Sequence, residues 1–293
     1  MKKEKISSGK LYKIFVYVAL ITLAISIIVP VVWVFMSSLK TNAEFQGSPW
    51  SLPASFYIQN FLDAFEKANM AEYFLNSVIV TALGLLLLVV IALPASYVLA
   101  RFDFKGKKFI NTAFMGGLFI NVNYIVVPIF LMLTSWDDVI YDMIGDFFFL
   151  DNIVILAVVY AATAIPFTVY LLSSYFRTLP KAYEEAAFID GCGYFKTMIK
   201  VMAPMAKPSI ITVILFNFLA FWNEYIIALT LMPGGASKTL PVGLVTLSKG
   251  QMAAANYGQL YAGLVIVMLP TLILYIMVQK KLTQGMTLGG LKD

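Results

Sequence analysis

Six long apolar stretches constrain the fold of this 293-residue chain more than any other feature. Its residues are 60% hydrophobic and 13% charged, whereas about 25% of the residues in a soluble domain are charged. Because the bilayer core offers no water to the backbone, membrane spans are helices of roughly 20 residues or strands of closed barrels. Apolar runs of this length predict an all-α, polytopic membrane protein.

We expect a single transmembrane domain over residues 1–293. The first span follows a basic start, as in a signal peptide, but it is too long for a signal h-region and no A-x-A cleavage site follows it. Proline inside several spans is compatible with membrane helices, where neighbouring helices satisfy the freed backbone groups. The predicted transmembrane helices lie at residues 11–38, 73–100, 109–134, 153–175, 209–231 and 260–278.

The positions of Lys and Arg predict the orientation of these spans. With both termini inside, 17 of the 21 basic residues fall on the inner side of the membrane. Cytoplasmic loops are enriched in Lys and Arg, so the sequence predicts a cytoplasmic N-terminus, a cytoplasmic loop at 181–204 and a cytoplasmic tail at 279–293. The net charge of +5 follows from this topology, and no recognition fold for nucleic acid accompanies it.

Missing residue types exclude several kinds of chemistry. The chain has no His and one Cys, which removes Ser-His and Cys-His catalysis and the commonest metal ligand. It also lacks a G-x-x-x-x-G-K-[ST] phosphate-binding loop, so any ATP would bind to another chain. We therefore expect no catalytic residue, no metal site and no cofactor on this chain.

An acidic stretch lies in the predicted outer loop at 136–151, where five Asp residues occur without a base. It has two interpretations, a docking edge for a basic partner or a solvated loop. Charge runs are usually solvated, so the sequence favours the second.

The predicted cytoplasmic loop contains the motif Glu185-Ala186-Ala187-x-x-Asp190-Gly191. Residues 181–189 suit a short helix in which Ala186 and Ala187 allow another surface to approach closely. Asp190 has the short acceptor of a helix N-cap, and Gly191 can adopt a positive φ. An apolar stripe that includes Tyr194 and Phe195 follows, until prolines lead into the fifth span. These features predict a helix-turn-helix; an ordinary amphipathic linker is the alternative.

The motif and its flanks resemble those of permeases in maltose-type, binding-protein-dependent ABC importers. The similarity extends from about Asn76 to Lys292, and the matching motifs occur in the same order as in that family. Cys192 departs from the family's usual Ala, and Asp293 departs from its final Gly. The other marks are Ala95–Phe102, Ile165–Phe167, Tyr175–Pro180, Trp222–Tyr225, Thr239–Leu244 and the tail with Gly285 and Gly289-Gly290-Leu291-Lys292.

The resemblance implies a transport subunit of a bacterial plasma membrane and not an enzyme. Its partners would be a second permease, two ATP-binding cassette subunits that hold ATP and Mg²⁺, and an extracellular or periplasmic sugar-binding protein. Glu185, Ala186, Ala187, Asp190 and Gly191 would couple the permease to an ATPase. The tail residues Gly285, Gly289, Gly290 and Lys292 would contact the ATPases.

Candidates for the substrate path come from polar residues within the spans. Glu224 is the only acidic residue in a predicted span, and a carboxylate in lipid is expensive, so it should face protein or water. Asn217 and Phe221 share its helical face, and Asn223 is its neighbour. Asn121 and Tyr124 form a second pair of a polar and an aromatic residue. Hydrogen bonding between helices is the competing interpretation for each of them.

The expected function is therefore ATP-driven import of a carbohydrate, with an oligosaccharide as the expected substrate. Another solute, such as glycerol phosphate or a polyol, is the alternative within transport. An anionic solute would favour basic residues in the path, yet the spans carry none away from their ends. An autonomous channel is the alternative from a different class, and it would have no need of the loop at 181–204.

Overall fold

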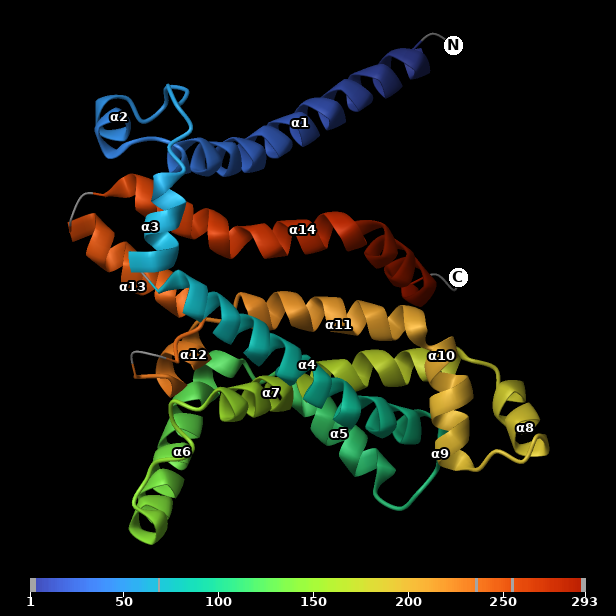
Figure 1. The fold of residues 1–293 in the computed structure, drawn as a ribbon. Helices are drawn as coiled ribbons and strands as arrows, with labels where there is room; N and C mark the ends of the chain where they lie inside the picture. The colour runs from blue at the N-terminus through green and yellow to red at the C-terminus, as the bar shows by residue number, and fades with distance from the viewer. Residues whose placement is uncertain (1–3, 68, 235–236, 254–255, 291–293) are drawn as a thin grey trace. The chain divides into compact units, whose positions relative to one another are not determined.

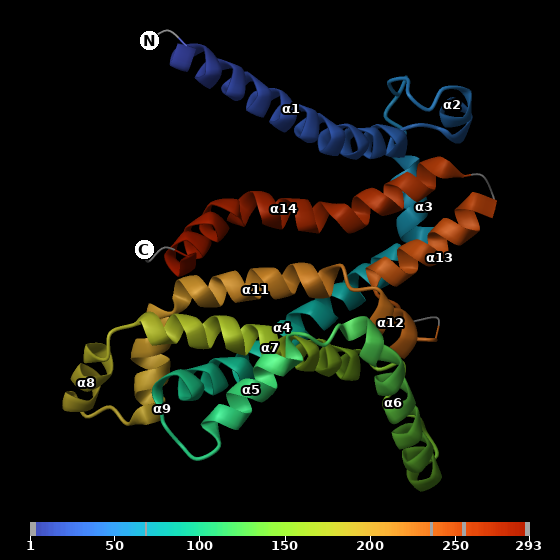
Figure 2. The same ribbon diagram turned by 180° about the vertical axis from the view of Figure 1, so that it is seen from behind.

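The computed structural model describes residues 4–67, 69–234, 237–253 and 256–290, and within these ranges every regular element is a helix (Figures 1 and 2). The elements are α1 (Glu4–Ser38), α2 (Asn42–Gly47), α3 (Gln59–Lys67), α4 (Met70–Arg101), α5 (Lys107–Gly117), α6 (Val122–Ile144), α7 (Ile153–Thr178), α8 (Ala182–Ile189), α9 (Tyr194–Thr197), the π-helix η1 (Met198–Met202), α10 (Ala203–Met205), α11 (Lys207–Trp222), α12 (Ile226–Leu231), α13 (Leu240–Ala253) and α14 (Tyr257–Gly290).

Apolar helices long enough to cross a membrane confirm the predicted all-α, polytopic class. Five single helices qualify, and a sixth span arises if the bent pair Tyr194–Met205 and Lys207–Trp222 is counted as one. Even in α7, the most enclosed of the five, the chain itself buries only 33% of the apolar window. Most of this apolar surface is therefore left uncovered by the described part of the chain. The single spans are Tyr12–Ser38, Met70–Arg101, Val122–Met143, Ile153–Thr178 and Tyr257–Gln279.

Two of the expected spans are interrupted. The stretch 109–134 is divided between α5 and α6, because Gly116 and Gly117 end the first helix and the Asn121 side chain caps the second by accepting from Asn123 N at 3.0 Å. The stretch 209–231 is divided between α11 and α12 at Asn223–Tyr225. Apolar length alone did not reveal these breaks.

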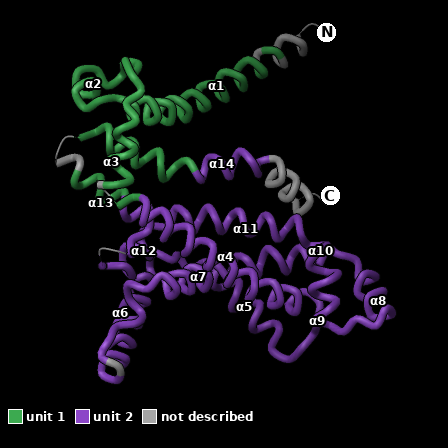
Figure 3. Tube along the Cα trace, in the orientation of Figure 1, with its two compact units in different colours: residues 1–70, 244–269 green, residues 71–243, 270–293 purple. Residues whose placement is uncertain are grey.

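The chain forms two compact units, which Figure 3 colours separately. The larger comprises residues 71–243 and 270–293. In it α7 packs against α5 and α11, as Figures 1 and 2 show. Its core includes Leu88 of α4 and Leu156 of α7, and the tilted rings of Tyr160 and Phe221 pack with 5.3 Å between their centroids. This packing positions the ends of α7 and α11, which the loop at 181–204 connects.

The smaller unit comprises residues 1–70 and 244–269. Lys40 is fully buried there, and its Nζ donates to the carbonyl oxygens of Ser48 at 3.2 Å and Pro49 at 2.9 Å. Asn60 Nδ2 donates to the backbone of Ser38 and Lys40. These contacts fix the turn that follows α1, so Lys40 has a structural role in addition to its charge.

Most of the acidic stretch at 136–151 is exposed, as the favoured interpretation predicts, but Asp137 is not. Asp137 is 1% exposed, and its carboxylate accepts hydrogen bonds from the backbone N–H groups of Phe148, Phe149 and Leu150 at 2.7, 2.7 and 2.8 Å. Asp151 accepts from Gly234 N at 2.7 Å. At least these two carboxylates therefore organise the chain's own backbone.

Candidate functional site

The segment between α7 and α11 forms the expected helix-turn-helix. Figures 1 and 2 show α8 beyond the C-terminal end of α7, at the edge of the larger unit, where it contacts α9 and η1. The chain reverses after Ile189 and returns through α9, η1 and α10. The returning segment Tyr194–Met205 then meets α11 at a bend of 77°. The prolines of the sequence lie at this bend, Pro204 in α10 and Pro208 in the first turn of α11.

The reversal depends on backbone geometry at Gly191. Its φ is +76°, as predicted, and its N–H donates to Phe188 O at 3.0 Å. An added Cβ would meet nothing within 4 Å, so the backbone angle, and not crowding, requires glycine here. The prediction that Asp190 caps the second helix is wrong. Asp190 ends α8, and Gly193 precedes α9, because the reversal takes up the residues between them.

Four of the five predicted coupling residues are exposed: Glu185, Ala186, Asp190 and Gly191. Ala187 is only 4% exposed and packs within the loop, where its carbonyl accepts from Cys192 N at 2.9 Å. Ala187 therefore permits close packing of the loop on itself, whereas Ala186 faces outward. Large apolar side chains are exposed beside them, with Ile189 87% and Phe195 74% exposed.

Polar contacts join the loop to the end of α4. Tyr97 Oη donates to Glu184 Oε1 at 2.7 Å, and Arg101 Nε lies 3.5 Å from Glu184 Oε2. Arg101 Nη2 also donates to Leu179 O at 2.7 Å. Sequence reasoning missed this cluster. The available signal was a Tyr and an Arg four residues apart, on one face of the last turn of an apolar span.

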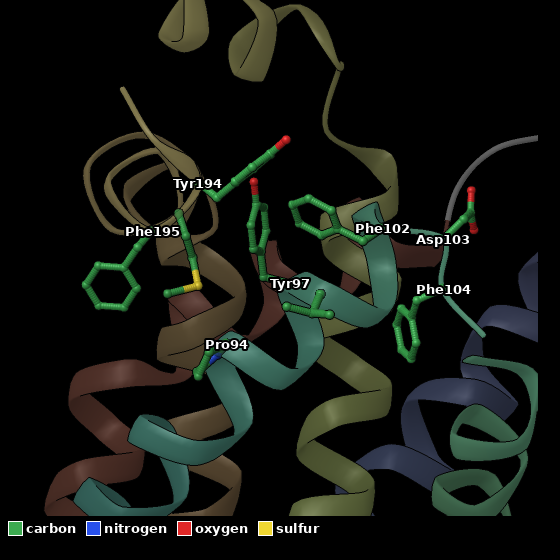
Figure 4. A pocket seen from close by; sticks show the side chains of 9 residues that line it. Pro94, Tyr97, Phe102, Asp103, Phe104, Tyr194 and Phe195 are labelled. Atoms are coloured by element: carbon green, nitrogen blue, oxygen red, sulfur yellow. The ribbon is translucent and has the colours of Figure 1, made fainter. Parts of the chain in front are cut away.

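Aromatic rings surround the same junction, where a pocket of about 570 Å³ lies between α4 and α9. Phe102 packs between Tyr97 and Tyr194, with centroid distances of 5.6 and 5.4 Å. Figure 4 shows these three rings together, with Phe195 and Phe104 on opposite sides. Asp103 lines the pocket, and its hydrogen bond with Lys107 lowers the pKa of its carboxyl.

Residues 92–287 match the sequence profile of the family described as "Binding-protein-dependent transport system inner membrane component". The chain belongs to this family. It is therefore a membrane permease subunit of the ABC importer class, as the motif at 185–191 indicated.

Relatives of this permease match it over nearly their whole length. The diacetylchitobiose uptake system permease protein NgcG of Streptomyces coelicolor is 35% identical over 97% of this chain and 90% of its own. The trehalose/maltose transport system permease protein MalG of Thermococcus litoralis is 28% identical over 96% and 98%. A chain of a bacterial ABC transporter involved in the import of the acidic polysaccharide alginate shares the fold, with a TM-score of 0.76, 22% identity and coverage of 93% and 97%.

The predicted tail of the permease lies only partly within the described residues. Gly285, Gly289 and Gly290 continue the helix α14, which ends at Gly290. Lys292 lies outside the described residues. The contacts expected of the tail stay a prediction.

Of the predicted path residues, Asn217, Phe221 and Glu224 lie at or near the break between α11 and α12. Glu224 accepts from Tyr160 Oη at 2.8 Å and from the backbone N–H groups of Ile227 and Ala228 at 2.7 and 2.9 Å. Its carboxylate thus starts α12 and joins it to α7. This satisfies the expectation that Glu224 faces protein, and it favours the structural interpretation.

Among the described residues, the other path candidates make no hydrogen bond with the carboxylate of Glu224. Asn121 caps α6, and Tyr124 is 82% exposed. Asn223 is exposed, and its Nδ2 donates to Leu219 O at 2.8 Å. No hydrogen bond between described residues connects this group with Glu224. The structure therefore does not bring the second predicted pair, Asn121 and Tyr124, into one polar cluster with Glu224.

Asn217 offers a test between path and packing. It is 4% exposed, and its Nδ2 donates to Thr168 Oγ1 at 3.1 Å and to Val213 O at 2.9 Å. We expect Asn217→Leu to lower the stability of the purified permease by about 1 kcal/mol, a typical value for a hydrogen bond between membrane helices. Thr168→Val added to it should restore part of the loss, because no unpaired hydroxyl is then left. Thermal unfolding in detergent measures both, and unchanged stability of the single variant would contradict the packing role.

Proposed function

We propose that this permease is the membrane-spanning half of an ATP-driven importer and that the loop at 181–204 docks on an ATP-binding cassette subunit. The observation that carries the proposal is the exposed outer face of α8 and its turn, held in one conformation by Gly191 and by the contacts to α4. An exposed apolar residue such as Ile189 beside polar Glu185 and Asp190 suits a protein interface, which combines apolar anchors with a polar rim.

ATP and Mg²⁺ bind to the partner in this proposal. The sequence lacks a phosphate-binding loop, so the permease contributes movement and a path. The docking loop must face the ATPases, which gives the permease cytoplasmic termini and agrees with the distribution of Lys and Arg. A second permease completes the path, and a binding protein delivers the substrate from the other side.

A carbohydrate is the proposed substrate class. Two observations support it: the relatives are named for the uptake of diacetylchitobiose and of trehalose or maltose, and the predicted spans carry no basic residue away from their ends. The absence of bases favours a neutral saccharide over an anionic solute such as glycerol phosphate, because an anion would need a positive partner in the low-dielectric path.

Purification of the tagged protein from its native host tests the assembly. The tag belongs at the N-terminus, since the tail is proposed to contact the ATPases. We expect an ATPase and a second permease to co-purify in gentle detergent. A homo-oligomer of this chain alone would contradict the proposal and favour the autonomous channel.

Uptake by a host strain lacking this gene, with and without the gene restored, tests the substrate class. The probes are labelled diacetylchitobiose, trehalose, maltose, glycerol phosphate and a polyol. Gene-dependent uptake of a saccharide supports the proposal. Gene-dependent uptake of glycerol phosphate or the polyol alone would overturn the carbohydrate assignment while leaving the ATPase-driven assembly in place.

A further inference from the structure

The junction between α4 and α8 contains polar side chains that are almost completely buried. Tyr97 is 2% exposed, and the side chains of Arg101 and Glu184 are 6% and 13% exposed. A buried ion pair is costly to form but strongly destabilising to break, because the remaining charge then has no partner. These three residues, which we name the α4–α8 cluster, therefore hold the two helices in one arrangement.

Arg101 extends this arrangement to a third helix. Leu179, whose carbonyl accepts from Arg101, is the residue that ends α7. The last turn of α4 thus binds both the end of α7 and the first turn of α8, although 87 residues separate Tyr97 from Glu184. A displacement of α8 relative to α4 would have to break the hydrogen bond and the ion pair together.

The apolar contacts of the loop differ in kind from this cluster. Met198 and Met202 of η1 pack with Tyr97 and Phe176, which keeps the returning arm near α4 and α7. Hydrophobic packing is not directional, so it resists separation more than sliding. The pocket beside Tyr194 and Phe195 also leaves part of the α9 side without packed neighbours. The position of the loop along α4 is consequently fixed by the directional polar contacts of α8, and not by the apolar packing of η1 and α9.

We propose that Tyr97, Arg101 and Glu184 are positioning residues that make α8 and α4 move as one body, so that displacement of the docked loop is passed directly to the span α4. This inference rests on the proposed function, in which an ATPase displaces the loop. Docking itself uses the exposed face around Glu185–Gly191. Loss of the cluster should therefore uncouple movement of the ATPase from movement of α4 without releasing the ATPase from the complex.

Distance measurement within the whole complex tests this inference. Spin labels at Ala182→Cys on α8 and Val90→Cys on α4, in a Cys192→Ala background, report the separation of the two helices; both sites are exposed. The probe is ATP with vanadate, compared with the nucleotide-free complex. With the native cluster we expect one distance distribution that is the same in both states.

Glu184→Gln, Arg101→Gln and Tyr97→Phe should lose this constancy. In each, ATP with vanadate should shift or broaden the distribution while the ATPase still co-purifies. The reversed pair Arg101→Glu with Glu184→Arg restores the ion pair alone, because a carboxylate at position 101 cannot donate to Leu179 O and a guanidinium at position 184 cannot accept from Tyr97, so it should regain constancy only in part. Tyr97→Phe removes only the hydroxyl and keeps the ring and the ion pair. An effect of this variant therefore cannot be attributed to a general folding defect. Asp103→Asn with Lys107→Gln is the matched control, since this pair is an ion pair of 2.8 Å with an exposed Asp103.

Three results would overturn the inference. The first is a distance between the labels on α8 and α4 that changes with ATP and vanadate although the cluster is native. The second is a Glu184→Gln complex that behaves like the native one. The third is release of the ATPase by Glu184→Gln, which would assign Glu184 to docking. If no ATPase co-purifies even with the native chain, the proposed function itself fails, and this outcome is distinguishable from the other three.

Discussion

We expect the Gly191→Val permease to lose its ATPase during purification and to lose transport with it. Gly191 has a φ of +76°, where a β-branched side chain clashes with its own backbone. Holding a non-glycine residue in such a region costs about 1–3 kcal/mol, which lowers the equilibrium constant for forming the native turn by a factor of roughly 5 to 160. The exposed face on both sides of the turn then loses its shape. Co-purification of the ATPase and uptake of the saccharide measure the loss.

Gly193 provides a matched control for this change. It lies two residues away and, like Gly191, has nothing within 4 Å of an added Cβ, but its φ of −74° and ψ of 168° are extended. A β-branched residue adopts such angles readily, so Gly193→Val should retain the ATPase. Gly191→Asn should retain most of it too, because Asn tolerates the left-handed region. Equal losses from both Val variants would show that bulk, and not backbone geometry, disrupts docking.

The second large effect is expected at Asp137. Asp137→Ala leaves three backbone N–H groups, those of Phe148, Phe149 and Leu150, without their acceptor. These hydrogen bonds are only partly buried, so each lost acceptor should cost about 1 kcal/mol, and the unfolding free energy should fall by about 3 kcal/mol in all. In a chain of this size such a loss lowers the melting temperature by roughly 5 °C. Thermal unfolding of the purified permease measures it.

Asp138 is the control for charge at this position. It is the next residue and is exposed, so Asp138→Ala removes the same charge without removing the backbone acceptor. Asp137→Asn should fall between the two, since its remaining oxygen can still accept from Phe148 and Phe149 while its amide meets Leu150 N–H. If Asp137→Ala and Asp138→Ala unfold at the same temperature, the carboxylate does not organise this segment.

Local chemistry in the sequence predicted the class of fold and the turn. Apolar length is a local property, and it predicted membrane helices because lipid leaves the backbone no other partner. The positive φ at Gly191 was also predictable, since an Asp-Gly pair between two helical patterns favours it. The same local reasoning placed Asp190 one helix too late, because it could not tell how many residues the reversal takes up.

Contacts between distant residues could not be predicted in this way. Arg101 looked like an ordinary inner-side cation, and only the fold brings it to Leu179 and Glu184. Asp137 looked like one charge in a solvated run, yet it is buried under the segment that follows α6. Glu224 was expected to face protein or water, but its role in starting α12 follows from the break at Asn223–Tyr225. In each case the hydrogen-bond or ion-pair partner lies outside the local sequence pattern from which the residue was interpreted.

The bend of 77° between the Tyr194–Met205 segment and α11 determines how α11 can respond to a force on the loop. A force applied to a straight helix along its own line has no lever arm about its axis. Here the Tyr194–Met205 segment stands nearly at right angles to α11. A force on this segment that is perpendicular to both helix axes therefore acts on α11 as a torque about its own axis. Asn217 and Phe221 lie on α11 and would turn with it. Rotation of a helix, as well as its tilt, is thus available to this permease as a way to change which side chains line its interior.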